Sequence, residues 1–399
     1  RRVRVLGQDH PDTLTSVNNL AIALQSRGKY NEAETMTRRA LVGRQKVLGL
    51  DHPDTLSSLH DLAVLLKYQE KYDESEKINR RALEGRQKVL GWNHPDTLSS
   101  LHDLAIVVEC QGKFAESEEM NRLALEERSK IFGSDHPDTL SSLDNLAIVL
   151  DYQGKYDESE TMNRDALERR ERILGPDHPD TLATLTNLAL ALRYQGMYDE
   201  SAMINQRALE RRKVILGPDH PDTLTSGNNL AVVLGYQEKY DESEEMNRYT
   251  LKGRERILGP NHPHTLTSFN NLALVLQYQG KYDESEELNR HVLAVRDKVL
   301  GRDHPDTLVS VNNLAIVMES QGKYSESEKL NRRTLEGYRN IFGSEHPHTL
   351  TSLNNLAAPP QRQEKHEEPE AIHRDVLGVR YRVLGLDHPD ALGSLKNLA

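Results

Sequence analysis

Apolar residues recur along the chain in two alternating stripes, each with the spacing of one helix face. In the segment 10–51, the first stripe consists of Leu14, Val17, Leu20, Ala21 and Leu24. The second stripe consists of Ala33, Met36, Ala40, Leu41, Val47 and Leu48. Intervals of three and four residues place each stripe on one side of an α-helix. The pattern predicts a first helix over about 11–27 and a second over about 31–48, and the alanines in both stripes allow the two to pack closely.

The whole pattern repeats every 42 residues. A His-Pro pair marks each repeat without insertion or deletion, at His10, His52, His94, His136, His178, His220, His262, His304, His346 and His388. A fixed period between 20 and 50 residues is typical of a solenoid, in which each repeat packs only on its neighbours. We therefore expect the end of a repeat at 1–9, eight regular repeats over 10–345, a degenerate ninth at 346–387 and the start of a tenth at 388–399. Because the chain starts and stops in mid-repeat, we interpret it as a piece of a longer protein.

The helices carry signals for their ends. Pro11 fits the first position of a helix, where its missing N–H removes no hydrogen bond, and Gly28 fits the end of the first helix. The start of the second helix matches a reciprocal capping box in several repeats: Asn31 with Glu34, Asp73 with Glu76, and Asp157 with Glu160. Glutamate replaces the turn glycine at three positions, which are Glu70, Glu238 and Glu364. Either this turn does not need a positive φ, or these three turns are strained.

The ninth repeat departs from the pattern. Ala357 and Ala358 are followed by Pro359 and Pro360, where other repeats have apolar residues. Each proline removes a helical hydrogen bond and costs about 3 kcal/mol inside a helix. We expect the first helix of this repeat to stop near Ala358 and residues 359–369 to be irregular, either because a redundant repeat has decayed or because the segment is a hinge.

One set of residues resembles a known signature: Leu20, Ala21, Gly28, Tyr30, Ala33 and Ala40. These match the leucine, small residue, glycine, aromatic and two alanines of the tetratricopeptide repeat (TPR) family. The 42-residue form with HPDT, NNLA, GKY and RALE is similar to kinesin light chain, and closer still to the TPR arrays of fungal NLR-like (STAND) receptors. The resemblance implies an all-α, right-handed superhelical TPR solenoid of antiparallel helix pairs. In that family the first helices line a concave groove that binds peptides.

The resemblance places three columns of equivalent side chains in this groove. The first column is mostly asparagine: Asn19, Asp61, Asp103, Asn145, Asn187, Asn229, Asn271 and Asn313. The second column varies from repeat to repeat and contains Asn18, His60, His102 and Asp144. The positions seven residues further on, two helical turns along the same helix, vary in the same way: Lys67, Glu109, Asp151 and Arg193. The third is aromatic: Tyr68, Tyr152, Tyr194, Tyr236 and Tyr278.

Each column has a functional and a structural interpretation. Amides can donate to and accept from the backbone of an extended peptide, or they can bond a neighbouring helix and space the stack. The variable column fits a surface that selects a ligand, and equally a solvated face that has drifted. The tyrosines can anchor a ligand, or pack against the next first helix.

Charge narrows the choice of partner. The formal net charge is −11, which argues against a nucleic-acid surface, including that of a helical-repeat RNA reader. Acidic side chains gather in the N-terminal half of the expected groove, so a bound peptide should place its basic end there. We expect a protein or peptide ligand, with end-to-end self-association as a further possibility for the array.

We expect neither catalysis nor a cofactor. The sequence has no phosphate-binding loop, dinucleotide motif or HExxH. Most histidines belong to the His-Pro pairs, whose layers are too far apart to share a metal ion; only His60 with Asp61 and His102 with Asp103 could approach each other. A single cysteine, Cys110, and the absence of a long apolar run favour a cytoplasmic protein without a membrane anchor.

These observations predict a protein-binding module. Its leading role is the C-terminal ligand-sensing array of a fungal NLR-like receptor. A cargo adaptor like kinesin light chain and a structural spacer or self-assembling array are the alternatives.

Overall fold

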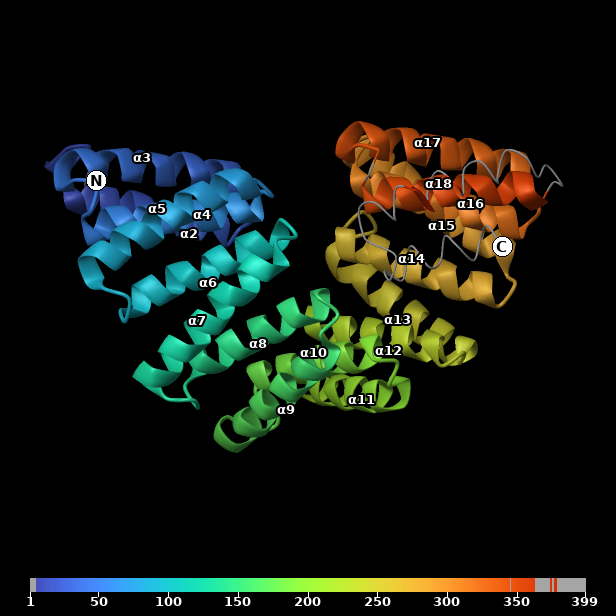
Figure 1. Ribbon diagram of the computed structural model, residues 1–399, viewed down its shortest axis with the longest axis horizontal. Coiled ribbons are helices and arrows are strands. Elements are labelled where there is room, and N and C mark those ends of the chain that lie inside the picture. Colours follow the sequence, from blue (N-terminus) through green and yellow to red (C-terminus); the bar gives the residue numbers. More distant parts are fainter. Residues whose placement is uncertain (1–4, 345, 363–373, 375–376, 379–399) are drawn as a thin grey trace. The chain divides into compact units, whose positions relative to one another are not determined.

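The computed structural model describes residues 5–344, 346–362, 374 and 377–378. These residues form α-helices and no strand, and they divide into two compact units, Arg1–Ile204 and Asn205–Ala399. Each repeat supplies a first helix that starts at its His-Pro pair and a second helix that starts after the glycine turn. Within each unit the helices pack on their neighbours in chain order (Figure 1). The all-helical repeat architecture predicted from the 42-residue period is confirmed.

The helices have closely similar bounds from repeat to repeat. The first unit contains α2 (Pro11–Gln25), α3 (Tyr30–Leu48), α4 (Pro53–Tyr68), α5 (Tyr72–Leu90), α6 (Pro95–Cys110), α7 (Phe114–Phe132), α8 (Pro137–Tyr152), α9 (Tyr156–Ile173) and α10 (Pro179–Tyr194). Helix α11 (Tyr198–Ile215) runs across the division. The second unit contains α12 (Pro221–Tyr236), α13 (Tyr240–Leu258), α14 (Pro263–Tyr278), α15 (Tyr282–Val299), α16 (Pro305–Ser320), α17 (Tyr324–Phe342) and α18 (Pro347–Arg362).

The His-Pro pair starts every described first helix. In α2, His10 is the N-cap residue and its Nδ1 accepts a hydrogen bond from the backbone N–H of Asp12 at 3.2 Å. Pro11 follows at the first helical position, where its missing N–H removes no helical bond. The same bond recurs at each described pair and measures 3.3 Å at His346. The histidine therefore satisfies one of the free N–H groups at the start of the helix.

The turn between the two helices requires a left-handed residue. Gly28 has φ of 72°, and both Glu70 and Glu238 have φ of 61° at the equivalent position. Glutamate is unfavourable in this region because its Cβ crowds the backbone. Of the two alternatives that the sequence left open, strain is the correct one at these two positions. Glu364 lies outside the described residues.

The capping boxes expected at the second helix are wrong. The N-cap of α3 is Lys29, without a side-chain hydrogen bond, so Asn31 lies inside the helix. Instead, Gln69 of the next repeat donates to the Asn31 side chain at 3.3 Å. The equivalent bonds join Gln111 to Asp73 at 2.9 Å and Gln195 to Asp157 at 3.0 Å. A signature that can close a local cap is here used to hold neighbouring repeats together.

An ion-pair network continues this contact along the second helices. Glu34 accepts from Arg38 at 2.8 Å and from Lys71 of the next repeat at 3.0 Å. Arg38 also reaches Glu74 of the next repeat at 2.7 Å. We call this arrangement of glutamate, arginine and lysine the clasp. It recurs with small changes in distance along both units.

The apolar stripes form the core between helices. Ala21, Ala33 and Ala40 are at most 1% exposed, which confirms the expected close approach of paired helices. Leu20 is 50% exposed, contrary to expectation, whereas its equivalent Leu62 is 1% exposed. In later repeats the second helix of the preceding repeat packs in the same core cluster as this leucine, as Leu41 does with Leu62, whereas the structure describes only residues 5–10 before α2.

The expected helix break in the ninth repeat is also wrong. Helix α18 continues past Ala358 through both prolines to Arg362. Pro359 has no N–H to donate to the carbonyl of Asn355, and that carbonyl instead accepts from Nδ2 of Asn331 at 2.9 Å. The remainder of the expected irregular segment, 363–369, and the predicted tenth repeat at 388–399 lie outside the described residues.

Candidate functional site

The asparagine column takes part in bonds between repeats. Asn18 Nδ2 donates to Asp61 Oδ2 at 2.8 Å, and Asn271 Nδ2 donates to Asn228 Oδ1 at 3.0 Å. In each case the residue of the variable column meets the next repeat's residue of the asparagine column, 43 positions later in the chain. Asn18 is only 8% exposed. These bonds between polar side chains therefore connect neighbouring repeats. Only the side chains of the two columns that form no such bond are open to a ligand.

The histidines of the variable column follow the same rule. His60 Nε2 lies 3.4 Å from Asp103 Oδ2, so the approach expected for these residues is present. His102 is hydrogen-bonded to Asn145 at 3.0 Å. Burial lowers the pKa of both histidines. No group of three potential metal ligands occurs in the described part of the chain, and these contacts connect neighbouring layers.

Three aspartates of the expected acidic face have internal partners. Asp61 accepts from Asn18, and Asp103 lies near His60 and 3.9 Å from Lys67 Nζ. Asp144 Oδ2 lies 2.5 Å from Nη1 of Arg170, a side chain that is 3% exposed. Burial raises the pKa of Asp144, and the Arg170 guanidinium opposes this change. These three carboxylates are engaged by the protein itself.

Glu109 on α6 and Asp151 on α8 differ from the other acidic residues. Burial raises the pKa of Glu109 to about 7, with Lys67 opposing the shift. Burial raises the pKa of Asp151 to about 6, against the Ser159 hydroxyl and the Arg193 guanidinium. At both residues the effect of burial on the pKa outweighs that of the nearby cation, which is Lys67 for Glu109 and Arg193 for Asp151. These two carboxyl groups, at equivalent positions one repeat apart, have the most strongly raised pKa values of the predicted site.

The tyrosine column lies beside them and is partly exposed. Tyr68, Tyr152, Tyr194, Tyr236 and Tyr278 are between 45% and 61% exposed. Tyr152 stacks on Phe114 with ring centroids 5.2 Å apart, and Tyr278 stacks on Tyr240 at 5.5 Å. The rings of Tyr68, Tyr152, Tyr194 and Tyr278 thus pack on the aromatic residue that begins the preceding repeat's second helix, rather than on a first helix. One face is fixed by stacking, and a large part of the ring remains accessible.

Other predicted residues also lie near this face. Lys67 Nζ lies 5.3 Å from the Tyr68 ring centroid, and the Arg193 guanidinium lies 4.8 Å from that of Tyr194. Asn19 is exposed. The remaining asparagines of the column are half-buried, at Asn187, Asn229 and Asn313. The structure thus brings charged and aromatic candidates together in pairs.

A column of buried arginines was missed by the sequence interpretation. Arg86 is 5% exposed, and its Nη1 donates to the backbone carbonyl of Asp96 at 2.8 Å and to Ser100 Oγ at 2.7 Å. Equivalent arginines occur in most repeats, for example Arg128 and Arg254. They tie each second helix to the start of the next repeat's first helix. An arginine at a fixed 42-residue interval inside an apolar stripe was the available signal.

The chain was compared with known families and proteins. The Tetratricopeptide repeat model matches eight overlapping segments that together run from 12 to 380: residues 12–88, 62–126, 96–172, 152–213, 182–256, 228–296, 265–340 and 310–380. No curated protein matches. None of the described helices has both the length and the apolar character needed to cross a bilayer.

Several solved structures are similar. Nearly identical TPR-like repeats of a putative kinesin light chain from Podosopora anserina are 25% identical, with 51% of this chain and 96% of that chain covered and a TM-score of 0.47. The apo quorum sensor NprR from B. thuringiensis is 13% identical over 92% of this chain and 97% of its own, with a TM-score of 0.60. A STAND protein with a tetratricopeptide repeat sensor from Pyrococcus horikoshii is 11% identical over 88% and 53%, with a TM-score of 0.54. The last two show a shared fold.

Proposed function

Because the chain belongs to the tetratricopeptide repeat family, we propose that it is a non-enzymatic module that binds a peptide or protein segment along the polar faces of its first helices. Repeats of this family commonly act as interaction scaffolds. The observation that carries the proposal is the pair Glu109 and Asp151. Burial raises both pKa values, and Lys67 and Arg193 offset this effect only in part. A cation of the ligand near these carboxyl groups would stabilise their ionised, negatively charged forms.

Recognition in the first unit follows from these groups. A lysine or arginine of the ligand pairs with Glu109, and its charge also favours the ionised form of Asp151, whose carboxylate oxygens are buried. Tyr152, stacked on Phe114 and 59% exposed, offers a pre-ordered aromatic surface to the neighbouring ligand residue. Amides of the asparagine column that are not used between repeats bind the ligand backbone. The ligand's basic end therefore lies on the first unit.

The test begins by isolating the ligand with the full chain on beads and identifying its binding segment on a peptide array. Affinity is then measured by fluorescence anisotropy for the wild type, for the double variant Glu109→Gln/Asp151→Asn, and for Glu119→Gln, an exposed control in the same unit. We expect the double variant to bind at least about tenfold more weakly and the control to be unchanged. Equal affinity of the double variant would refute the role of the pair.

The acidity of the same pair predicts a pH effect on binding. As the pH falls, Glu109 is half protonated at a pH of about 7 and Asp151 at a pH of about 6. Binding of a basic segment should therefore weaken in this range, and the double variant should lose the dependence. A pH profile identical in the two proteins would place the ligand elsewhere.

Two biological roles are compatible with a basic ligand. We favour the ligand-sensing array of a fungal NLR-like receptor, in which binding would act on a nucleotide switch elsewhere in the protein. A cargo adaptor like kinesin light chain is the alternative. The sequence that adjoins this chain distinguishes them, because a GxxxxGK[ST] motif would support the receptor and a heptad coiled coil the adaptor.

A structural spacer that stacks end to end is a third candidate. Static light scattering over a range of protein concentrations tests this alternative, and a constant monomer mass would exclude it. For all three roles we propose a cytoplasmic setting, since the lone thiol of Cys110 is exposed and suits a reducing compartment.

A further inference from the structure

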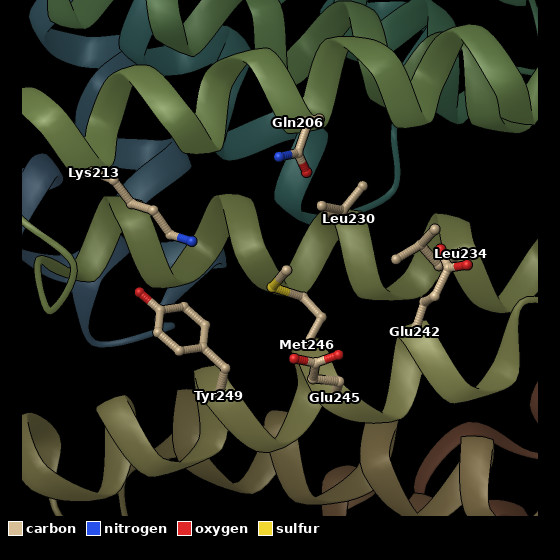
Figure 2. A pocket seen from close by; sticks show the side chains of 8 residues that line it. All are labelled: Gln206, Lys213, Leu230, Leu234, Glu242, Glu245, Met246 and Tyr249. Atoms are coloured by element: carbon tan, nitrogen blue, oxygen red, sulfur yellow. The ribbon is translucent and has the colours of Figure 1, made fainter.

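The second unit contains a pocket on the side of the second helices. It lies between α11 and α13, above α12, and has a volume of about 360 Å³. Leu230 and Leu234 of α12 form its floor, and Met246 and Tyr249 of α13 form one wall. Figure 2 shows the Met246 sulfur and the Tyr249 ring on the side facing α11, from which Gln206 and Lys213 approach. The pocket is separate from the first-helix faces discussed above.

The clasp is incomplete at this pocket. In six other places an arginine of one second helix pairs with a glutamate 36 residues later, at 2.5 to 3.4 Å: Arg38–Glu74, Arg80–Glu116, Arg122–Glu158, Arg164–Glu200, Arg248–Glu284 and Arg290–Glu326. At the equivalent position the chain has Gln206, whose side chain donates to Glu210 of its own helix at 2.6 Å. The glutamate that corresponds to the acceptors is Glu242, which has no hydrogen bond or ion pair among the described residues. The arginine of the clasp is therefore missing here, and Ala202 stands where the glutamate beside it lies in other repeats.

The missing arginine also uncovers the pocket floor. Where the arginine is present, at Arg290, its Nη2 lies 3.9 Å from the sulfur of Met318 on the next first helix. Met318 is the equivalent of Leu234, and both are 28 residues beyond the clasp position. Met318 is 0% exposed, whereas Leu234 under the shorter Gln206 is 8% exposed. The pocket therefore occupies the space that the arginine takes up elsewhere.

We propose that this pocket binds an arginine side chain, next to an apolar residue, of a protein partner. The guanidinium takes the place of the absent clasp arginine, pairing with Glu242 and lying on Leu234. A planar guanidinium suits this position better than an ammonium, because it can pair with a carboxylate while it rests on an apolar surface. The apolar neighbour fills the space between Leu230, Met246 and Tyr249.

A lysine occupies one end of the pocket, whose lining also includes Glu242 and Glu245. Lys213 Nζ lies 4.8 Å from the Tyr249 ring centroid at one end of the pocket. The Tyr249 hydroxyl donates to the carbonyl of Pro218 at 2.8 Å, which holds the ring in place. Lys213 would repel a basic residue at its end of the pocket, so an apolar residue beside the arginine suits that end. This distinguishes the pocket from the acidic pair Glu109 and Asp151 of the first unit.

The test uses the full chain and a defined probe, the peptide acetyl-Gly-Leu-Arg-Leu-Gly-amide, with the same peptide carrying glutamine for arginine as its counterpart. Gln206→Arg supplies the arginine that would pair with Glu242 and fills the pocket from within, while Ala202 still occupies the position of the other clasp glutamate. We expect it to weaken probe binding at least about tenfold in titration calorimetry and to raise the thermal midpoint of the protein. Because the variant gains an ion pair, loss of binding would not arise from loss of folding.

A second variant pair keeps the test specific. Glu242→Gln removes the proposed acceptor and should weaken the probe about tenfold. Glu287→Gln is the matched control, because Glu287 is an exposed glutamate in the next repeat at the position of Glu245. Unchanged affinity in Gln206→Arg, equal binding of the two peptides, or no binding of the arginine peptide at millimolar concentration would overturn the proposal. Since Glu109 and Asp151 play no part, their variants should leave probe binding unaltered.

Discussion

Replacing Asp151 by asparagine tests whether the first unit carries an uncompensated buried charge. The side chain is 7% exposed, and burial raises its pKa from 3.8 to about 6. A folded state that holds a proton more tightly than the unfolded chain is stabilised below the unfolded pKa, and this stabilisation is lost as the pH rises through the folded pKa. The window therefore runs from about pH 4 to about pH 6. A difference of about two pKa units corresponds to about 3 kcal/mol of unfolding free energy.

Asp151→Asn cannot ionise, so it escapes this loss. We expect the variant's gain in unfolding free energy over the wild type to be larger at pH 8 than at pH 4, by about 2–3 kcal/mol. Urea unfolding followed by far-UV circular dichroism at pH 4, 6 and 8 measures the difference. The exposed Glu119→Gln serves as the control and should follow the wild type at every pH. A variant that differs from the wild type by the same amount at pH 4 and pH 8 would refute the assignment of a desolvated carboxylate.

Three further predictions concern the frame of the array. Glutamate at position 238 has a φ of 61°, so Glu238→Gly should raise the unfolding free energy by about 1 kcal/mol. Gly154→Glu at the equivalent turn should lower it by a similar amount. Urea midpoints measure both changes. His178→Ala removes the N-cap bond to the Asp180 N–H and should cost about 1 kcal/mol, seen as a lower thermal midpoint. The Lys155 ammonium lowers the pKa of Glu118 to about 2. Glu118→Gln should therefore destabilise the protein by about 1 kcal/mol at pH 7, and progressively less as the pH falls from about 4 toward 2. Acid titrations of both proteins by circular dichroism would show their stabilities converge.

Much of the fold could be predicted because the 42-residue period multiplies every weak signal. His10 and Pro11 alone would be a modest sign of a helix start, but ten copies at one interval define the layers. Ala21 and Ala40 indicated close helix packing for the same reason. The conformation of the turn was harder to predict, because a left-handed residue is usually glycine and positions 70 and 238 have glutamate. Only the observed φ values show that the backbone geometry is kept and the side chain tolerated.

The polar contacts could not be predicted in the same way. Asn31 and Glu34 fit a local capping box, and sequence spacing cannot show that a neighbouring repeat offers Gln69 and Lys71 as partners instead. The proline pair of the ninth repeat misled for a related reason. Asn331, 24 residues before Asn355, satisfies the carbonyl that Pro359 leaves free. In both cases the deciding atom comes from another layer of the stack.

The same reasoning separates residues that build the array from those that remain available to a ligand. Asp103 and Asp144 resemble Glu109 and Asp151 in the sequence, but the first two meet His60 and Arg170 inside the stack. A polar side chain that occurs in every repeat is therefore most often consumed by its neighbours. Where one repeat lacks the residue that usually pairs with such a side chain, the side chain can pair with a group of a ligand instead. In a solenoid of near-identical layers, binding sites are therefore expected where a repeated polar contact is interrupted, not where it is most regular.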